Sequence, residues 1–146
     1  MTAEKKGDSA FARLQADATY LSEAFDSISR RLQEVEKQLT SLPVKTNVTV
    51  GDDPEDISHP EFSALSFVRL NDNQWGLLLS YRDDHDKLQN IAVMKAGAAE
   101  KALAATLLPA LVRKLFTETS RRRGLASAAM EALDQAELIL KNGEGR

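Results

Sequence analysis

The sequence predicts an α+β fold: a long coiled-coil-like N-terminal helix, a four-stranded antiparallel sheet, and two C-terminal helices packed on that sheet. Three observations predict it. Apolar residues recur every 3.5 positions on average before residue 43, at every second position in the middle of the chain, and at helical spacing towards its end. We therefore expect a disordered segment over 1–8, a helix over 9–42 and an α+β domain over 44–142, with strands within 44–95 and helices within 97–142.

Two apolar columns predict the N-terminal helix. One column holds Phe11, Ala18, Phe25, Leu32 and Leu39, and the other holds Leu14, Leu21, Ile28, Val35 and Leu42. A 3.5-residue repeat held over several heptads is typical of a helix that packs lengthwise against another helix. Pro43 ends the helix, because proline disfavours helical backbone at the preceding residue and lacks a donor N–H.

The length of this helix indicates that part of its stripe needs a partner. At about 1.5 Å per residue the helix is roughly 50 Å long. A globule of the remaining 100 or so residues is only about 35 Å across. The partner is either the C-terminal segment or a second chain, and Arg31 and Glu36 beside the stripe suit an ion pair between chains. We expect a homodimer, or pairing with another helical protein, through Leu14, Leu21, Phe25, Ile28, Leu32, Val35 and Leu39. The alternative is an intramolecular helical bundle.

Alternating polarity predicts the strands. Val44, Thr46, Val48 and Val50 alternate with polar residues over 44–50, and further strands are expected over 63–70, 75–82 and 88–94. Trp75, Leu77, Leu79 and Tyr81 fall on one face of the third strand, where Trp75 anchors the sheet on the helices rather than marking a ligand site. Short polar turns at residues 71–74 and 83–87 predict an antiparallel meander.

Two helices are expected after residue 97. The first carries an apolar stripe that stays in phase past Pro109, so we expect a kink there. Gly124 after three arginines suits a helix C-terminus, where cations meet the negative end of the helix dipole. The last helix then runs to residue 140 with Ala129, Leu133, Ala136 and Leu140 facing inward, and Asn142-Gly143 closes it.

Composition excludes several function classes. The chain contains no cysteine, which excludes disulfides, thiol catalysis and thiolate metal sites and fits a reducing cytoplasm. We expect a cytoplasmic protein without a membrane partner, because no secretory signal and no apolar run of about 20 residues is present. Neither a serine elbow nor a glycine-rich phosphate loop occurs. We therefore predict no catalytic residues and no cofactor, and an enzyme is not favoured.

Acidic residues cluster in two segments. Asp52, Asp53, Asp56 and His59 offer the oxygen and nitrogen ligands that a metal ion takes, but their spacing does not match a calcium-binding loop. A solvated acidic loop explains them without a metal. The second cluster, Asp83 to Asp86, reads first as a turn between two strands, because consecutive turn residues point in different directions.

Basic residues gather on the C-terminal helices. Arg113, Lys114, Arg121, Arg122 and Arg123 form a possible anion-binding set, because arginine binds phosphate oxygens in pairs. The net charge of −3 and the absence of a nearby aromatic residue for base stacking argue against nucleic acid.

These patterns favour a non-enzymatic protein–protein interaction or assembly module that self-associates through its N-terminal helix. One alternative is a polyanion-binding module, for nucleic acid or phosphate, that uses the basic set. Another is a metal-binding protein or enzyme that uses the acidic loops. The small acidic dimeric format also suits a substrate-specific chaperone, although that comparison rests on format alone.

Overall fold

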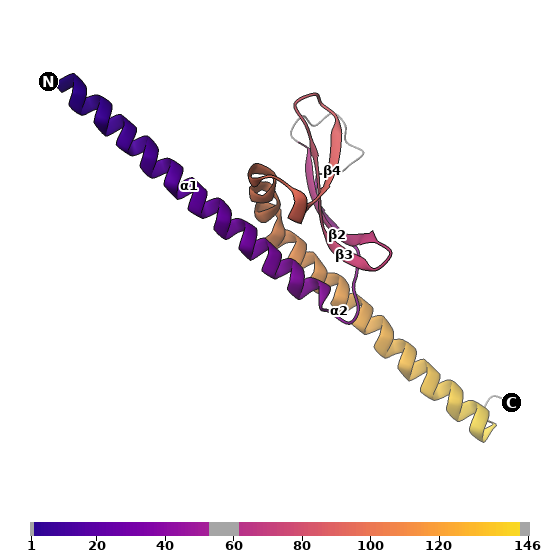
Figure 1. The fold of residues 1–146 in the computed structure, drawn as a ribbon. Coiled ribbons are helices and arrows are strands. Elements are labelled where there is room, and N and C mark those ends of the chain that lie inside the picture. The colour runs from indigo at the N-terminus through magenta and orange to yellow at the C-terminus, as the bar shows by residue number, and fades with distance from the viewer. Residues whose placement is uncertain (1, 53–61, 144–146) are drawn as a thin grey trace.

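In the computed structural model the described residues are 2–52 and 62–143, with side chains described from Ser9 onwards. Two helices and four strands follow one another along the chain (Figure 1). The helix α1 spans Thr2–Thr40 and is followed by β1 (Val48–Gly51), β2 (Ser63–Asn71), β3 (Gln74–Arg82) and β4 (Leu88–Ala92). The 3-10 turn η1 (Val93–Lys95) then leads into α2 (Ala98–Asn142). The predicted α+β class is therefore confirmed.

The sheet has the order β1-β2-β3-β4, and all its neighbours are antiparallel, as the predicted meander requires. Residues that face one another across antiparallel strands share a face of the sheet. Phe67 pairs with Val48 on one side and Leu77 on the other, while Leu79 pairs with Ile91. One face of the sheet is thus apolar across all four strands.

The first and last strands are shorter than the sequence predicts. β1 begins at Val48 rather than at Val44, which is 65% exposed. If the β1–β2 pairing continued, Thr46 would lie opposite Arg69. At Arg69 the register between β2 and β3 changes, and the β1–β2 pairing ends before this irregularity. At the other end Val93 and Met94 belong to η1 instead of the fourth strand.

Both helices pack on the apolar face of the sheet. Leu32 of α1 and Leu111 and Leu115 of α2 are buried in the same cluster as strand residues from β1, β2 and β3. Trp75 and Tyr81 are half-buried at its margin, and the rings of Trp75 and Phe67 lie 5.4 Å apart between centroids. Trp75 therefore has the packing role that the sequence predicts.

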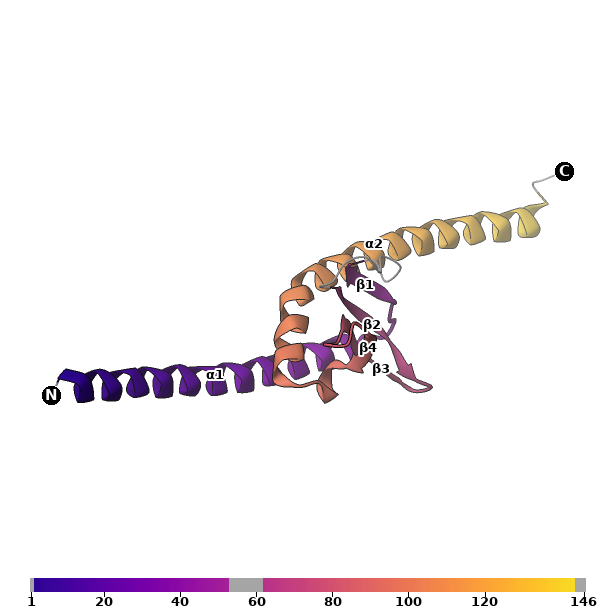
Figure 2. The same ribbon diagram turned by 90° about the horizontal axis from the view of Figure 1, so that it is seen from above.

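The C-terminal region forms one helix, so the prediction of two helices separated at Gly124 is wrong. α2 is unbroken from Ala98 to Asn142, although it contains Pro109, and Figure 2 shows its first part bending before the straight remainder. A single glycine costs a helix only about 1 kcal/mol relative to alanine, which the flanking turns tolerate. The helix ends where a left-handed residue is available, at Gly143 with φ of 69°, whose N–H donates to the carbonyl of Ile139.

The two helices run in the same direction and overlap only over part of their lengths (Figures 1 and 2). The N-terminal part of α1 and the C-terminal part of α2 project from opposite ends of the molecule. We call residues 2–24 the α1 arm and residues 120–142 the α2 arm. The helix begins at Thr2, whereas the sequence predicts a helix from residue 9. The prediction that the last helix faces inward is wrong, because α2 has already left the sheet and four side chains are exposed: Ala129, Leu133, Ala136 and Leu140.

Candidate interaction surface

The heptad stripe of α1 divides into a packed half and a projecting half. Leu32 is 1% exposed, and Ile28 and Leu39 pack against the same core within the single chain. Phe25 lies at the boundary and is half-buried. Leu14 and Leu21 lie on the α1 arm, where they are 63% and 48% exposed. The structure therefore assigns the second half of the predicted interface to the intramolecular core and leaves the first half uncovered by the described residues.

The α2 arm exposes a second set of large apolar side chains. They are Leu125, Met130, Leu133, Leu138, Ile139 and Leu140. Every residue of this arm is exposed, and its sequence combines these side chains with several alanines. A helix that is apolar over much of its circumference is normally covered by other protein. Sequence reasoning missed this surface, because it assigned the last helix to the sheet.

A groove lies at the base of the α2 arm, where the end of α1 and the middle of α2 lie side by side. This junction groove has a volume of about 500 Å³ and is lined by Val35, Gln38, Leu39, Leu42, Val112, Leu115, Phe116 and Thr119. Phe116 is 73% exposed although its lining neighbours Val35, Leu39 and Leu115 are wholly or partly buried. The apolar surface therefore continues from the end of α1 onto the middle of α2.

Polar contacts fix the packed half of α1 on the body. The Glu36 carboxylate accepts a hydrogen bond of 2.9 Å from the backbone N–H of Leu77, whereas β4 pairs with β3 only from Leu78 onwards. Gly76 permits this approach, because a Cβ there would lie 3.2 Å from the Glu36 carboxylate and closer still to Leu70. Lys101 of α2 donates to the Ser29 hydroxyl at 2.9 Å. Glu36 thus serves the single chain rather than the predicted ion pair between chains.

The basic set on α2 does not converge on one point. Lys114 donates to the backbone carbonyl of Thr49 at 2.7 Å, and Arg122 donates to the Thr46 hydroxyl at 2.8 Å. Arg121 pairs with Glu118 one turn earlier. Successive residues on a helix are rotated by about 100°, so Arg121, Arg122 and Arg123 point in three directions. Arg113 and Arg123 are exposed. The capping role predicted for the arginines is wrong, because α2 continues for about five more turns.

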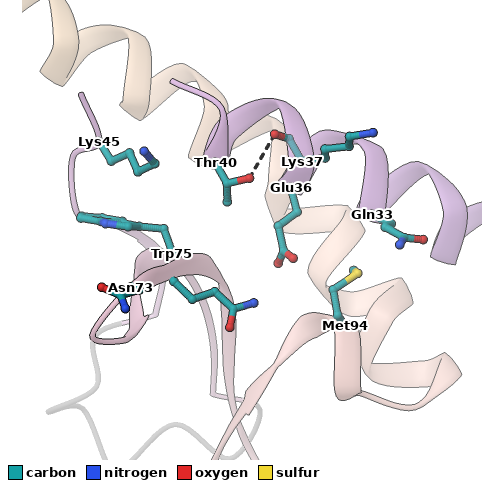
Figure 3. A pocket seen from close by; sticks show the side chains of 9 residues that line it. Gln33, Glu36, Lys37, Thr40, Lys45, Asn73, Trp75 and Met94 are labelled. Atoms are coloured by element: carbon teal, nitrogen blue, oxygen red, sulfur yellow. Dashed lines mark hydrogen bonds between the residues drawn. The ribbon is translucent and has the colours of Figure 1, made fainter. Parts of the chain in front are cut away.

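A polar cleft lies between the end of α1 and the β2–β3 turn (Figure 3). It has a volume of about 400 Å³ and is lined by Gln33, Glu36, Lys37, Thr40, Lys45, Asn73, Gln74, Trp75 and Met94. Glu36 reaches from α1 towards the sheet, where it accepts the Leu77 N–H. Trp75 stacks near Phe67. The two side chains best suited to bind a ligand here therefore already have structural partners.

The acidic residues have structural roles where they are described. Asp53, Asp56 and His59 lie outside the described residues, and Asp52 accepts a hydrogen bond from the Ser63 N–H at 3.1 Å. In the second cluster, Asp83 accepts from the N–H groups of Lys87 and His85 and from the side-chain amide of Gln89.

These contacts lower the pKa of the Asp83 carboxyl below its ordinary 3.8, the Lys87 N–H contributing most and the Gln89 amide next. A lowered pKa stabilises the fold above pH 3.8, and this contribution is lost as the pH falls through the lowered value. Asp83 thus organises the β3–β4 turn, and within the described residues no group of three acidic or histidine side chains is placed to hold a metal ion.

No protein family model matches this sequence, and no curated protein or solved structure is similar enough to count as a match. None of the described helices is long and apolar enough to cross a membrane.

Proposed function

We propose that this protein is a non-enzymatic assembly module that self-associates through its projecting N-terminal helix. The observation that carries the proposal is the exposure of Phe11, Leu14 and Leu21 on one face of an arm that no described part of the chain covers. Burying one such side chain contributes about 1.5–3 kcal/mol, so pairing of the stripe offers a strong driving force. A cytoplasmic setting, where a cysteine-free chain needs no disulfides, is part of this proposal.

Pairing would also stabilise the arm as a helix. Most helical stability in proteins comes from packing of an apolar face rather than from intrinsic propensity. The α1 arm has no tertiary packing over residues 9–23, all of which are exposed. Assembly would supply that packing, while the sheet is presented on the outside of the complex.

The first test is the solution mass of the purified protein by light scattering, for the parent and for a Leu14→Glu/Leu21→Glu variant. Both side chains are exposed, so charging them leaves the folded core intact. We expect a parent dimer and a dissociation constant at least about 100-fold weaker in the variant, from the loss of two buried leucines. Ile28 is unsuitable for this test, because it packs against the core.

A matched control separates the stripe from the added charge. Ala12→Glu/Thr19→Glu adds the same charges with the same spacing of seven residues, at exposed positions away from the stripe. This control should keep the parent mass. A monomeric parent at all concentrations, or equal effects of the two double variants, would contradict the proposal.

A further inference from the structure

The two arms of the chain are matched in length and oppositely placed. Residues 2–24 and residues 120–142 each form a helical segment of roughly 35 Å, at about 1.5 Å per residue. The arms leave opposite ends of the body, and their helices run in the same direction (Figure 1). A pairing of α1 arms alone would therefore leave the α2 arm and its exposed leucines uncovered.

We propose that two copies assemble antiparallel, with the α1 arm of each copy packed along the α2 arm of the other. This inference rests on the self-association proposed above and specifies its partner surface. A two-fold axis across the helices reverses their direction and exchanges the two ends of the molecule. One such axis therefore covers all four arms in a closed dimer, which is the commonest form of soluble oligomer. The junction groove, with Phe116 and Leu42, lies where the four helices approach the axis.

The apolar stripes match in this arrangement. On α2 the stripe predicted from the sequence comprises Ala129, Leu133, Ala136 and Leu140, and the same alternation of steps of four and three extends it back to Ala126. Pairing positions that sum to 147 places each α1 stripe residue from Phe11 to Leu21 opposite a position of this α2 stripe. The pairs are Phe11 with Ala136, Leu14 with Leu133, Ala18 with Ala129, and Leu21 with Ala126. Alanine opposite a large side chain allows helices to approach closely.

Cysteine cross-linking tests the pairing, because the parent chain contains no cysteine. Ala18→Cys and Ala129→Cys replace small side chains that face one another in the proposed dimer. The two positions lie on arms at opposite ends of one molecule, so a disulfide between them must join two chains (Figure 1). We expect the Ala18→Cys/Ala129→Cys variant to oxidise to a covalent dimer without larger species, at least about tenfold faster than either single variant.

Other pairings give different products. Parallel pairing of the stripes would open into a filament and would join Leu21→Cys to Ala136→Cys rather than to Ala126→Cys. In that register position 18 faces position 133, so the Ala18→Cys/Ala129→Cys variant would not oxidise to a covalent dimer. Links within Ala18→Cys or within Ala129→Cys alone would show pairing of like arms. Either result, from a parent that is dimeric by light scattering, overturns this inference and leaves the proposed self-association standing. A monomeric parent overturns both.

Discussion

At the scale of single residues, Glu36 shows how a charged side chain can belong to the core rather than to an interface. Its carboxylate lies between α1 and the sheet and accepts the Leu77 N–H, at a point where β3 is paired on one side only. An unpaired backbone donor that is buried costs the folded state about 1–3 kcal/mol. Glu36 therefore supplies the hydrogen-bond acceptor that β4 does not provide for the Leu77 N–H.

Replacing Glu36 should destabilise the fold. We expect Glu36→Ala to lower the free energy of unfolding by about 1–2 kcal/mol, because the Leu77 N–H loses its acceptor while water reaches it only partly. Chemical denaturation followed by circular dichroism measures this. Glu34→Ala is the matched control, since Glu34 lies on the same helix and is exposed. Equal unfolding energies for the two variants would show that the hydrogen bond contributes nothing.

Residue-level reading from the sequence succeeds where one pattern has one structural solution. Leu77 and Leu79 lie two positions apart on the predicted face and both are fully buried, whereas Leu78 between them is only half-buried. The role of Glu36 was not predictable, because its partner is 41 positions away and is a backbone group that any residue type would supply. The candidate interaction surface was predictable only in part. The heptad spacing places Leu14 and Leu32 on one stripe, but only the fold determines that Leu32 is buried within the chain and Leu14 is exposed.

At the scale of elements, the largest difference between sequence and structure is the continuity of α2. A glycine after three arginines resembles a helix C-terminus, because glycine is common just past the last turn and cations are favourable at the negative end of the helix dipole. The structure continues through Gly124, because neighbouring residues such as Leu125, Ala126 and Ala128 favour helix strongly enough to offset one glycine. The cost of one glycine in a helix, about 1 kcal/mol, is therefore too small by itself to set where the helix ends.

Gly124→Ala should therefore stabilise the α2 arm. Position 124 has helical backbone, and no described atom lies within 4 Å of the site that a Cβ would occupy. We expect about 0.5–1 kcal/mol of added helix stability, seen as greater helical ellipticity and a higher melting temperature of the arm. Gly143→Ala is the control and should have the opposite effect, because its φ of 69° strains an alanine. A loss of helicity in Gly124→Ala would restore the predicted break.

At the scale of the whole molecule, the staggered helices leave large apolar side chains exposed on the two arms, outside the body that contains the core. The buried core gathers around the sheet, whereas Leu14, Leu21, Leu133 and Leu140 lie far from it on the arms. Because the two arms point apart, they cannot cover each other within one chain. In the proposed dimer the α1 arm of each copy covers the α2 arm of the other, so burial of one arm is thermodynamically linked to burial of the other.

This linkage gives a prediction for hydrogen exchange. In the proposed dimer, amides of the α1 arm and of the α2 arm become protected together as the protein concentration rises, because one association event orders both. Amides of the exposed β3–β4 turn exchange through local fluctuations rather than through global unfolding, so their rate should be independent of concentration and serves as the internal control. The decisive case is Leu14→Glu/Leu21→Glu, which alters the α1 arm alone. Loss of protection in the α2 arm of that variant is expected, since its cover comes from the partner's α1 arm. Undiminished protection there would mean that each arm pairs with its own kind.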